Sequence, residues 1–140
     1  MCFQGVYPLD LLPSTIIKPL INVLNLDKQY MPSSQWVALC FSDSRYAEYF
    51  DSYGLLPLKF EIMAHFQRHS ISWTFNRYRL QGLKANVCGY YCCPYALHRA
   101  NGLSMTSFVN MIIPARYTCN GKKVVRVVIM PLSHPPTKPN

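Results

Sequence analysis

The sequence predicts a single α+β domain in which a small sheet packs against helices. Short runs of β-branched and aromatic residues, separated by turn residues, predict strands in the first 80 positions. Longer stretches with helical spacing predict helices later, above all over residues 88–100. With 140 residues, half of them hydrophobic, the chain can build one sizeable core. We expect residues 1–132 to form the domain and the proline-rich residues 133–140 to be a disordered tail.

Four segments have the composition of strands. Before the first of these strands, residues 6–15 carry two prolines, which predict an extended segment or turn rather than a strand. The predicted strands are residues 20–26, 35–41, 45–51 and 73–80. Turn residues at 42–44 join the second and third of them into a hairpin, and residues 27–34 form a polar loop.

Three segments predict helices. Pro57 opens the first, which runs to about Arg68 with apolar residues and His65 at helical spacing. The second covers residues 88–100 and ends at Asn101-Gly102. Ser104 caps the third, over residues 105–111. Residues 123–130 are β-branched and fit either a strand or a last helix.

Charge is distributed unevenly along the chain, whose net charge is +8. Residues 1–61 hold six acidic and four basic side chains, whereas residues 62–140 hold ten basic side chains and no acidic one. A half of the chain without acidic side chains indicates a polyanionic partner such as nucleic acid. The alternative is a basic surface that serves only solubility. Arg77 and Arg79 alternate with aromatic residues, a pattern that can bind nucleic acid by stacking and phosphate contact.

The six cysteines predict free thiols in a reducing compartment. The first residues lack the charged start and apolar run of a signal peptide, and no stretch approaches the roughly 18 apolar residues of a membrane span. We therefore expect an intracellular protein, in the nucleus or cytoplasm, with no membrane partner. Cys40, Cys92 and Cys93 are expected to be buried, while Cys119 lies in a loop.

One segment carries a chemical signature. Cys88 opens the predicted 88–100 helix, and Gln81 precedes it by seven residues. Unpaired N–H groups and a partial positive charge at a helix start lower the pKa of a thiol there. A glutamine side chain can stabilise an oxyanion. Together these residues indicate acyl transfer by a cysteine nucleophile.

Three spaced motifs resemble the adenovirus protease (adenain) family, and more closely its relatives in Polinton/Maverick-type DNA transposons and related viruses; the ubiquitin-like-protein proteases are more distant. The motifs are Gln35-Trp36-Val37-Ala38, Tyr49-Phe50-Asp51-Ser52-Tyr53-Gly54, and Gln81 followed by Cys88-Gly89-Tyr90-Tyr91-Cys92. The resemblance covers residues 5 to about 110. It implies a papain-like cysteine peptidase fold with a mixed sheet and rearranged catalytic order.

The resemblance also implies roles for four positions. Cys88 matches the nucleophile, Gln81 the oxyanion donor and Asp51 the acid that orients the catalytic histidine. That histidine should directly precede Trp36, where this chain has Gln35. A histidine takes the thiol proton and later protonates the leaving amine, whereas an amide does neither.

The chain therefore predicts a cysteine endopeptidase fold whose activity is absent or severely weakened. Its expected partner is an extended peptide or a viral or transposon polyprotein, and no cofactor is expected. The alternatives are a non-catalytic module that binds peptide or nucleic acid, and a structural protein of a mobile element or virion. His65, His69 and His134 do not lie at the motif position, and His98 is about 15 Å from Cys88 along the helix.

Three further features leave alternatives open. Asp51 could simply cap the turn at 52–54, without any histidine to orient. Cys88, Cys92 and Cys93 resemble a metal cluster, but Cys93 points away from the other two and no second motif completes four ligands. Pro94 removes one helical hydrogen bond and predicts a kink or a reorganised first turn.

Overall fold

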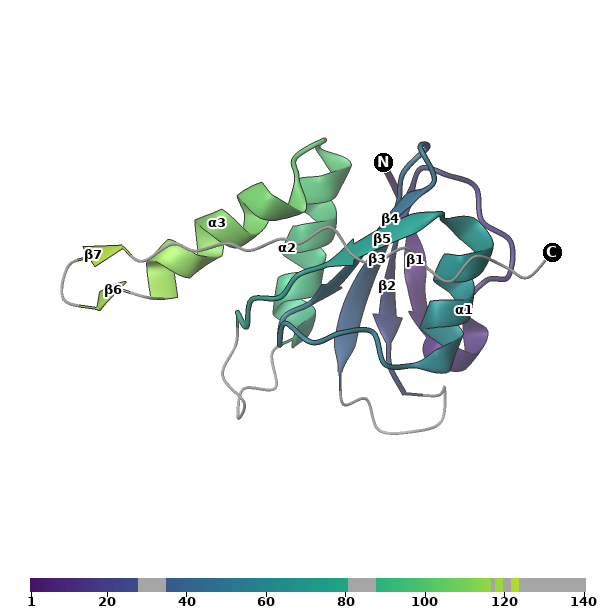
Figure 1. Ribbon diagram of the computed structural model, residues 1–140, viewed down its shortest axis with the longest axis horizontal. Coiled ribbons are helices and arrows are strands. Elements are labelled where there is room, and N and C mark those ends of the chain that lie inside the picture. The colour runs from purple at the N-terminus through teal and green to yellow at the C-terminus, as the bar shows by residue number, and fades with distance from the viewer. Residues whose placement is uncertain (28–34, 81–87, 117, 120–121, 124–140) are drawn as a thin grey trace.

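The computed structural model describes residues 1–27, 35–80, 88–116, 118–119 and 122–123, with side chains up to Ile112 except those of residues 88 and 89. Five strands form one sheet in the order β1-β2-β3-β4-β5 (Figure 1). The strands are β1 (Cys2–Pro8), β2 (Leu20–Asn25), β3 (Trp36–Phe41), β4 (Tyr46–Asp51) and β5 (Ser72–Phe75). Both central pairs are antiparallel and both outer pairs are parallel, so the sheet is mixed.

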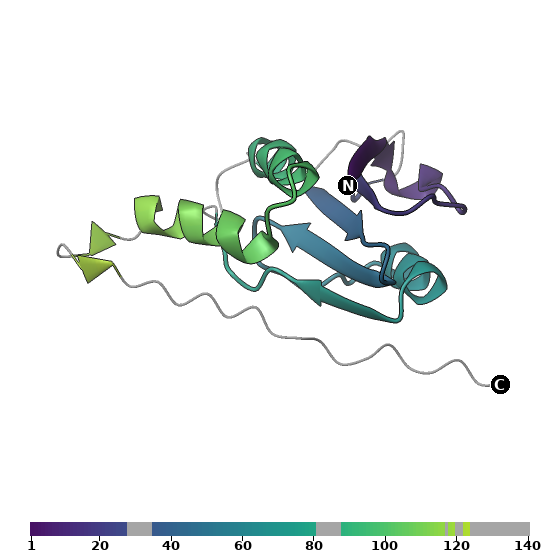
Figure 2. The same cartoon turned by 90° about the horizontal axis from the view of Figure 1, so that it is seen from above.

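Helices cover both faces of this sheet (Figure 1). A short 3-10 helix, η1 (Leu9–Leu11), follows β1, and α1 (Phe60–His69) packs on the same face as η1. The opposite face carries α2 (Cys88–Ala100) and α3 (Met105–Arg116). Figure 2 shows α3 extending outward to β6 (Thr118–Cys119) and β7 (Lys122–Lys123), which pair with each other. The α+β class with a mixed sheet against helices is thus confirmed.

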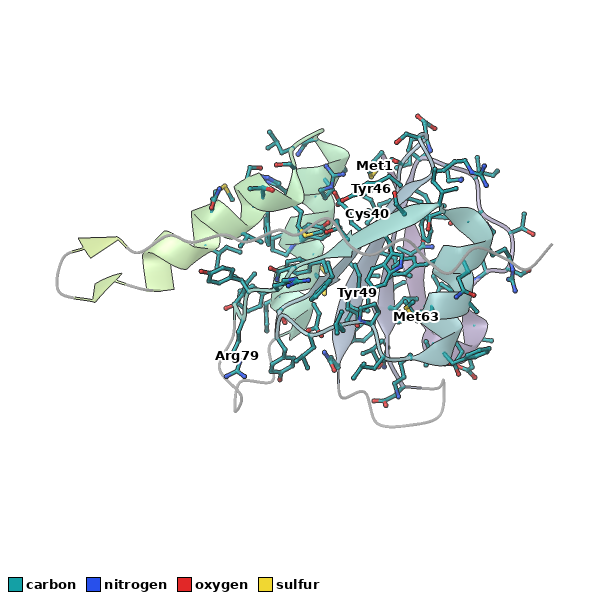
Figure 3. All side chains as sticks on the ribbon, in the orientation of Figure 1. Met1, Cys40, Tyr46, Tyr49, Met63 and Arg79 are labelled. Atoms are coloured by element: carbon teal, nitrogen blue, oxygen red, sulfur yellow. The ribbon has the colours of Figure 1, made fainter. Side chains whose placement is uncertain are left out.

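Alternation along the strands divides the core into two clusters. The cluster on the α1 face contains Leu9, Leu20, Leu24, Leu26, Val37, Leu39, Phe41, Ala47, Tyr49, Ile62, Phe66, Trp73 and Phe75. The cluster on the α2 face contains Ile21, Val23, Ala38, Cys40, Phe50, Leu80, Cys92, Tyr95, Ala96, Met105, Phe108 and Val109. In Figure 3, Tyr49 lies toward Met63 of α1 and Cys40 toward α2. Because both faces are covered, all but one residue of each of β2, β3 and β4 is buried.

Most predicted elements are present, with four corrections. Residues 2–8 form β1, although the prolines predicted an extended segment or turn. The first helix begins at Phe60 rather than Pro57, and Leu58, which fits the helical spacing of the predicted helix, precedes it and is 82% exposed. The strand predicted over residues 73–80 ends at Phe75. The third helix continues to Arg116. Apart from these four elements, Cys119 was expected in a loop but is the last residue of β6, where it pairs with Lys122.

Three expectations fall wholly or largely outside the described residues. The polar loop at 27–34 is described only at residue 27, and the predicted tail at 133–140 is not described. Of residues 123–130, only Lys123 is described, in β7, so the choice between strand and helix stays open.

Candidate functional site

The structure brings Gln35 and Asp51 together at one end of the sheet. Gln35 directly precedes β3, and Asp51 is the last residue of β4. Because these strands are antiparallel, with Val37 opposite Asp51, the start of one meets the end of the other. The Gln35 Nε2 group donates a hydrogen bond of 2.7 Å to the Asp51 Oδ2 atom. The position that the resemblance assigns to the histidine therefore contacts the position that it assigns to the acid.

The Asp51 carboxyl group is buried, with 1% of the residue exposed. Burial raises its pKa above the usual value, because the charged form loses its water. Hydrogen bonds from the Tyr53 backbone N–H, the Gln35 amide and the Leu55 backbone N–H oppose this effect. The Tyr53 bond reaches the Oδ1 atom at 2.8 Å. Asp51 thus caps the turn that follows β4 and also holds the side chain at position 35.

Hydrogen bonds join the turn after β4 to residues 76–80, the segment that leads to Gln81. The Asn76 Nδ2 group donates to the Asp51 and Tyr78 backbone oxygens at 3.2 and 2.9 Å. The Leu80 N–H donates to the Ser52 oxygen at 2.7 Å. Gly54 has a φ of +71°, and a Cβ atom there would lie 2.6 Å from the Tyr78 carbonyl carbon. Only glycine fits this position without displacing backbone.

The start of α2 is attached to the same segment. The Tyr91 hydroxyl donates a hydrogen bond of 2.9 Å to the Leu80 carbonyl oxygen. Leu80 is buried and directly precedes Gln81, which lies outside the described residues. The α2 backbone begins at Cys88, as the sequence predicts, but the Cys88 side chain is not described. Four features therefore converge on this end of the sheet: Gln35, Asp51, the segment before Gln81 and the first turn of α2.

The next turn of α2 tests the expectations for its cysteines and proline. Cys92 is buried in the α2-face cluster, as expected, but Cys93 is exposed. The expectation that Cys93 is buried is wrong because consecutive helix positions lie about 100° apart, so one residue faces the sheet and the next faces solvent. Pro94 lies inside the helix on an exposed position, and the assigned helix continues through it to Ala100.

A buried polar network anchors α2 on β4. The Tyr95 hydroxyl and the Arg99 Nε group both donate to the Glu48 Oε2 atom, at 2.7 and 2.8 Å. Cys40 Sγ lies 3.7 Å from the Tyr95 hydroxyl oxygen, and burial raises the pKa of the Cys40 thiol to about 12. Cys40 is therefore a core residue, as predicted, and an unreactive one.

The histidines with described side chains are engaged elsewhere. His98 on α2 has its Nε2 atom 2.6 Å from the Ser107 Oγ atom on α3. His65 and His69 lie at the C-terminal end of α1, where His65 is buried. His134 lies outside the described residues. None of the three described imidazoles bonds to Asp51 in the hydrogen bonds found for the described residues.

The predicted nucleic-acid surface and the metal-cluster alternative concern other parts of the molecule. Trp73 and Phe75 are buried in the α1-face cluster, so they offer no ring face on which a base could stack. Arg77 is exposed, with its guanidinium 5.0 Å above the centre of the Phe75 ring. Arg79 is also exposed (Figure 3). Among the described residues, no group of three or more histidine, cysteine or acidic side chains is arranged to hold a metal ion.

Sequence reasoning missed the side chains that position the site. Asn76 and Glu48 belong to no motif, and Tyr91 lies within the third motif without a predicted role. Their polar groups are the signal that could have indicated a structural role, because buried polar groups need partners. Comparison of the sequence with protein-family models and with curated proteins finds no match. No helix in the described part of the chain is long and apolar enough to cross a membrane.

Proposed function

We propose that this chain is an adenovirus-protease-like cysteine peptidase domain of the papain-like class whose peptidase activity is absent or severely weakened. The observation that carries the proposal is the 2.7 Å hydrogen bond from the Gln35 amide to the Asp51 carboxylate. An orienting acid in a catalytic triad bonds to its histidine in the same way, through a ring N–H. Gln35 reproduces that contact but has no ionisable group near neutral pH.

The roles of the other residues follow from the reaction. In an active relative, a thiolate attacks a peptide carbonyl, and water then hydrolyses the acyl-enzyme. Cys88 would attack, and Gln81 would donate to the oxyanion. Without a base, the Cys88 thiol loses its proton only to solvent, and no group protonates the leaving amine. Loss of a triad base lowers the rate by several orders of magnitude.

The direct test replaces Gln35 with histidine and measures hydrolysis of an internally quenched peptide with a Gly-Gly cleavage site. We expect kcat/KM to rise on the order of 10³-fold or more over the unmodified protein. Gln67→His is the matched control, since it adds an exposed histidine on α1. Cys88→Ala in the Gln35→His background should abolish the gain. Robust turnover by the unmodified protein would contradict the proposal.

The second candidate is a non-catalytic module on the same fold that binds an extended peptide or nucleic acid. The exposed Arg77 and Arg79 side chains favour phosphate contact. Because Trp73 and Phe75 are buried and Tyr78 is half-buried, binding would depend mainly on charge, with stacking limited to Tyr78 in this segment. Salt-sensitive binding of single-stranded DNA, weakened by Arg77→Ala together with Arg79→Ala, would support this candidate. No binding at low ionic strength would exclude the nucleic-acid form of it.

A further inference from the structure

The C-terminal turn of α1 carries two histidines in ring contact. His65 and His69 are one helical turn apart, and their ring centres lie 4.6 Å apart at 70°. Both rings also meet the edge or face of Phe41 on β3, at 5.2 and 6.2 Å. His65 is 3% exposed, so its imidazole belongs to the core between α1 and the sheet.

The same turn holds the segment that leads into β2. The His69 Nε2 atom lies 3.0 Å from the Ser14 backbone oxygen. Because a carbonyl oxygen only accepts, this nitrogen carries the hydrogen. The Lys18 Nζ group donates to the His69 backbone oxygen at 2.7 Å. Two hydrogen bonds therefore tie the Ser14–Lys18 segment to the end of α1.

The charges around this pair are mostly positive. The pKa of His65 is lowered to about 4, mainly by burial and also by the neighbouring His69 and Arg68. Burial is also the main cause that lowers the pKa of His69, with Arg68 and Lys18 acting in the same direction and the Ser14 bond opposing them. The His65 Nε2 atom is buried and has no hydrogen-bond partner within the described part of the chain.

Carboxylates on the neighbouring elements do not offset these positive charges. The turn before β4 meets the helix end through the bond from the Ile71 N–H to the Arg45 oxygen, and it carries Asp43 and Arg45, both exposed. Glu61, one turn before His65, is exposed as well. Neither carboxylate contributes to the pKa shift of either imidazole.

We propose that the His65–His69 pair is an acid-sensitive latch: protonation of His65 releases the end of α1 from Phe41, and with it the Ser14–Lys18 segment that is hydrogen-bonded to that end. His65 is the trigger because a protonated His69 still donates to the Ser14 carbonyl. In the closed state a charged His65 would be buried with an Nε2–H group that has no hydrogen-bond partner, and it would lie beside a second imidazole. When the helix end opens, the charged His65 imidazole is exposed to water.

The pH window follows from linkage. An exposed histidine has a pKa near 6.5, whereas His65 in the closed state has a pKa of about 4. Between these values the open state binds more protons than the closed one, so acidification favours opening. The ratio of closed to open molecules should fall about tenfold per pH unit across this window.

Nuclear magnetic resonance of the full chain, between pH 7.5 and 4, tests the latch. The ring signals of His65 and His69 report protonation, and the amide signals of residues 14–18 and 65–70 report opening. The amides of β3 report whether the sheet stays folded. We expect the helix-end signals to change between pH 6.5 and 4 together with the His65 ring, while the sheet signals persist.

Two variants distinguish the latch from a general acid effect. His65→Phe keeps an aromatic ring beside Phe41 and should abolish the acid response, whereas His98→Gln on α2 should leave it unchanged. An unaltered midpoint in His65→Phe would overturn the proposal, as would loss of the sheet signals at the same pH or no opening down to pH 4. If His65→Phe does not fold, the ring titration of the unmodified chain decides: a His65 pKa near 6.5 without opening refutes the latch.

Discussion

Removal of the Gln35 amide should destabilise the fold through Asp51. The carboxyl group is 1% exposed and receives hydrogen bonds from Gln35 and from two backbone N–H groups. Gln35→Ala leaves part of a buried carboxylate without a donor. A hydrogen bond to a charged group contributes about 1.5–3 kcal/mol, so we expect the free energy of unfolding at pH 7 to fall by about that amount.

The loss should depend on pH with a defined sign. The native pKa of Asp51 is already above its usual value, so its ionisation destabilises the fold as pH rises through that pKa. Removing the Gln35 donor raises this pKa further. The difference between Gln35→Ala and the unmodified protein should therefore grow as pH rises and shrink in acid, where Asp51 is protonated. Acid effects common to both proteins cancel in the difference.

Urea unfolding of four proteins measures the coupling: the unmodified chain, Gln35→Ala, Asp51→Asn and the double variant. The Gln35→Ala cost should be smaller in the Asp51→Asn background. Gln67→Ala, at an exposed glutamine on α1, is the control and should change stability by less than about 0.5 kcal/mol. A pH-independent cost for Gln35→Ala, equal in both backgrounds, would refute the reasoning.

Three further predictions concern the scaffold and the thiols. Glu48→Gln removes the charge that pairs with Arg99 in a partly buried ion pair and should lower the free energy of urea unfolding by about 1.5–3 kcal/mol. Gly54→Ala should cost at least about 2 kcal/mol in the same assay, because a Cβ atom there meets backbone at 2.6 Å; Gly102→Ala, with a φ of +81° and open space, should cost only about 1 kcal/mol. In alkylation followed by peptide mass spectrometry, the exposed Cys93 should react in the native protein and the buried Cys40 only after unfolding; equal native rates would contradict the burial described.

The sequence predicted the centre of the fold well because the central strands are short runs rich in β-branched, aromatic and other apolar residues, separated by turn residues. β2, β3 and β4 were expected within one residue of their bounds, and α2 was expected at Cys88–Ala100. β1 was missed because its side chains are mostly exposed or half-buried, so it shows neither alternation nor a continuous apolar run. The start of α1 was misplaced because Pro57 and Leu58 fit a helical pattern that the backbone adopts only from Phe60.

The candidate site was predicted in part. The resemblance placed Gln35 and Asp51 at one site, and their side chains are hydrogen-bonded. The tie through Asn76 could not be predicted, because it depends on how the turn after β4 meets the segment after β5. The Glu48–Arg99 ion pair was also missed, because its partners are 51 residues apart and join different elements.

The central claim is that position 35 is a histidine site facing Asp51, and the imidazole introduced by Gln35→His tests it most directly. Nitrogen-15 nuclear magnetic resonance spectra of that ring should show one N–H group in a hydrogen bond to the Asp51 carboxylate. It should also show a pKa above 6.5, which Asp51→Asn lowers because the negative partner is lost. An imidazole pKa of 6.5 that Asp51→Asn does not change would contradict the account.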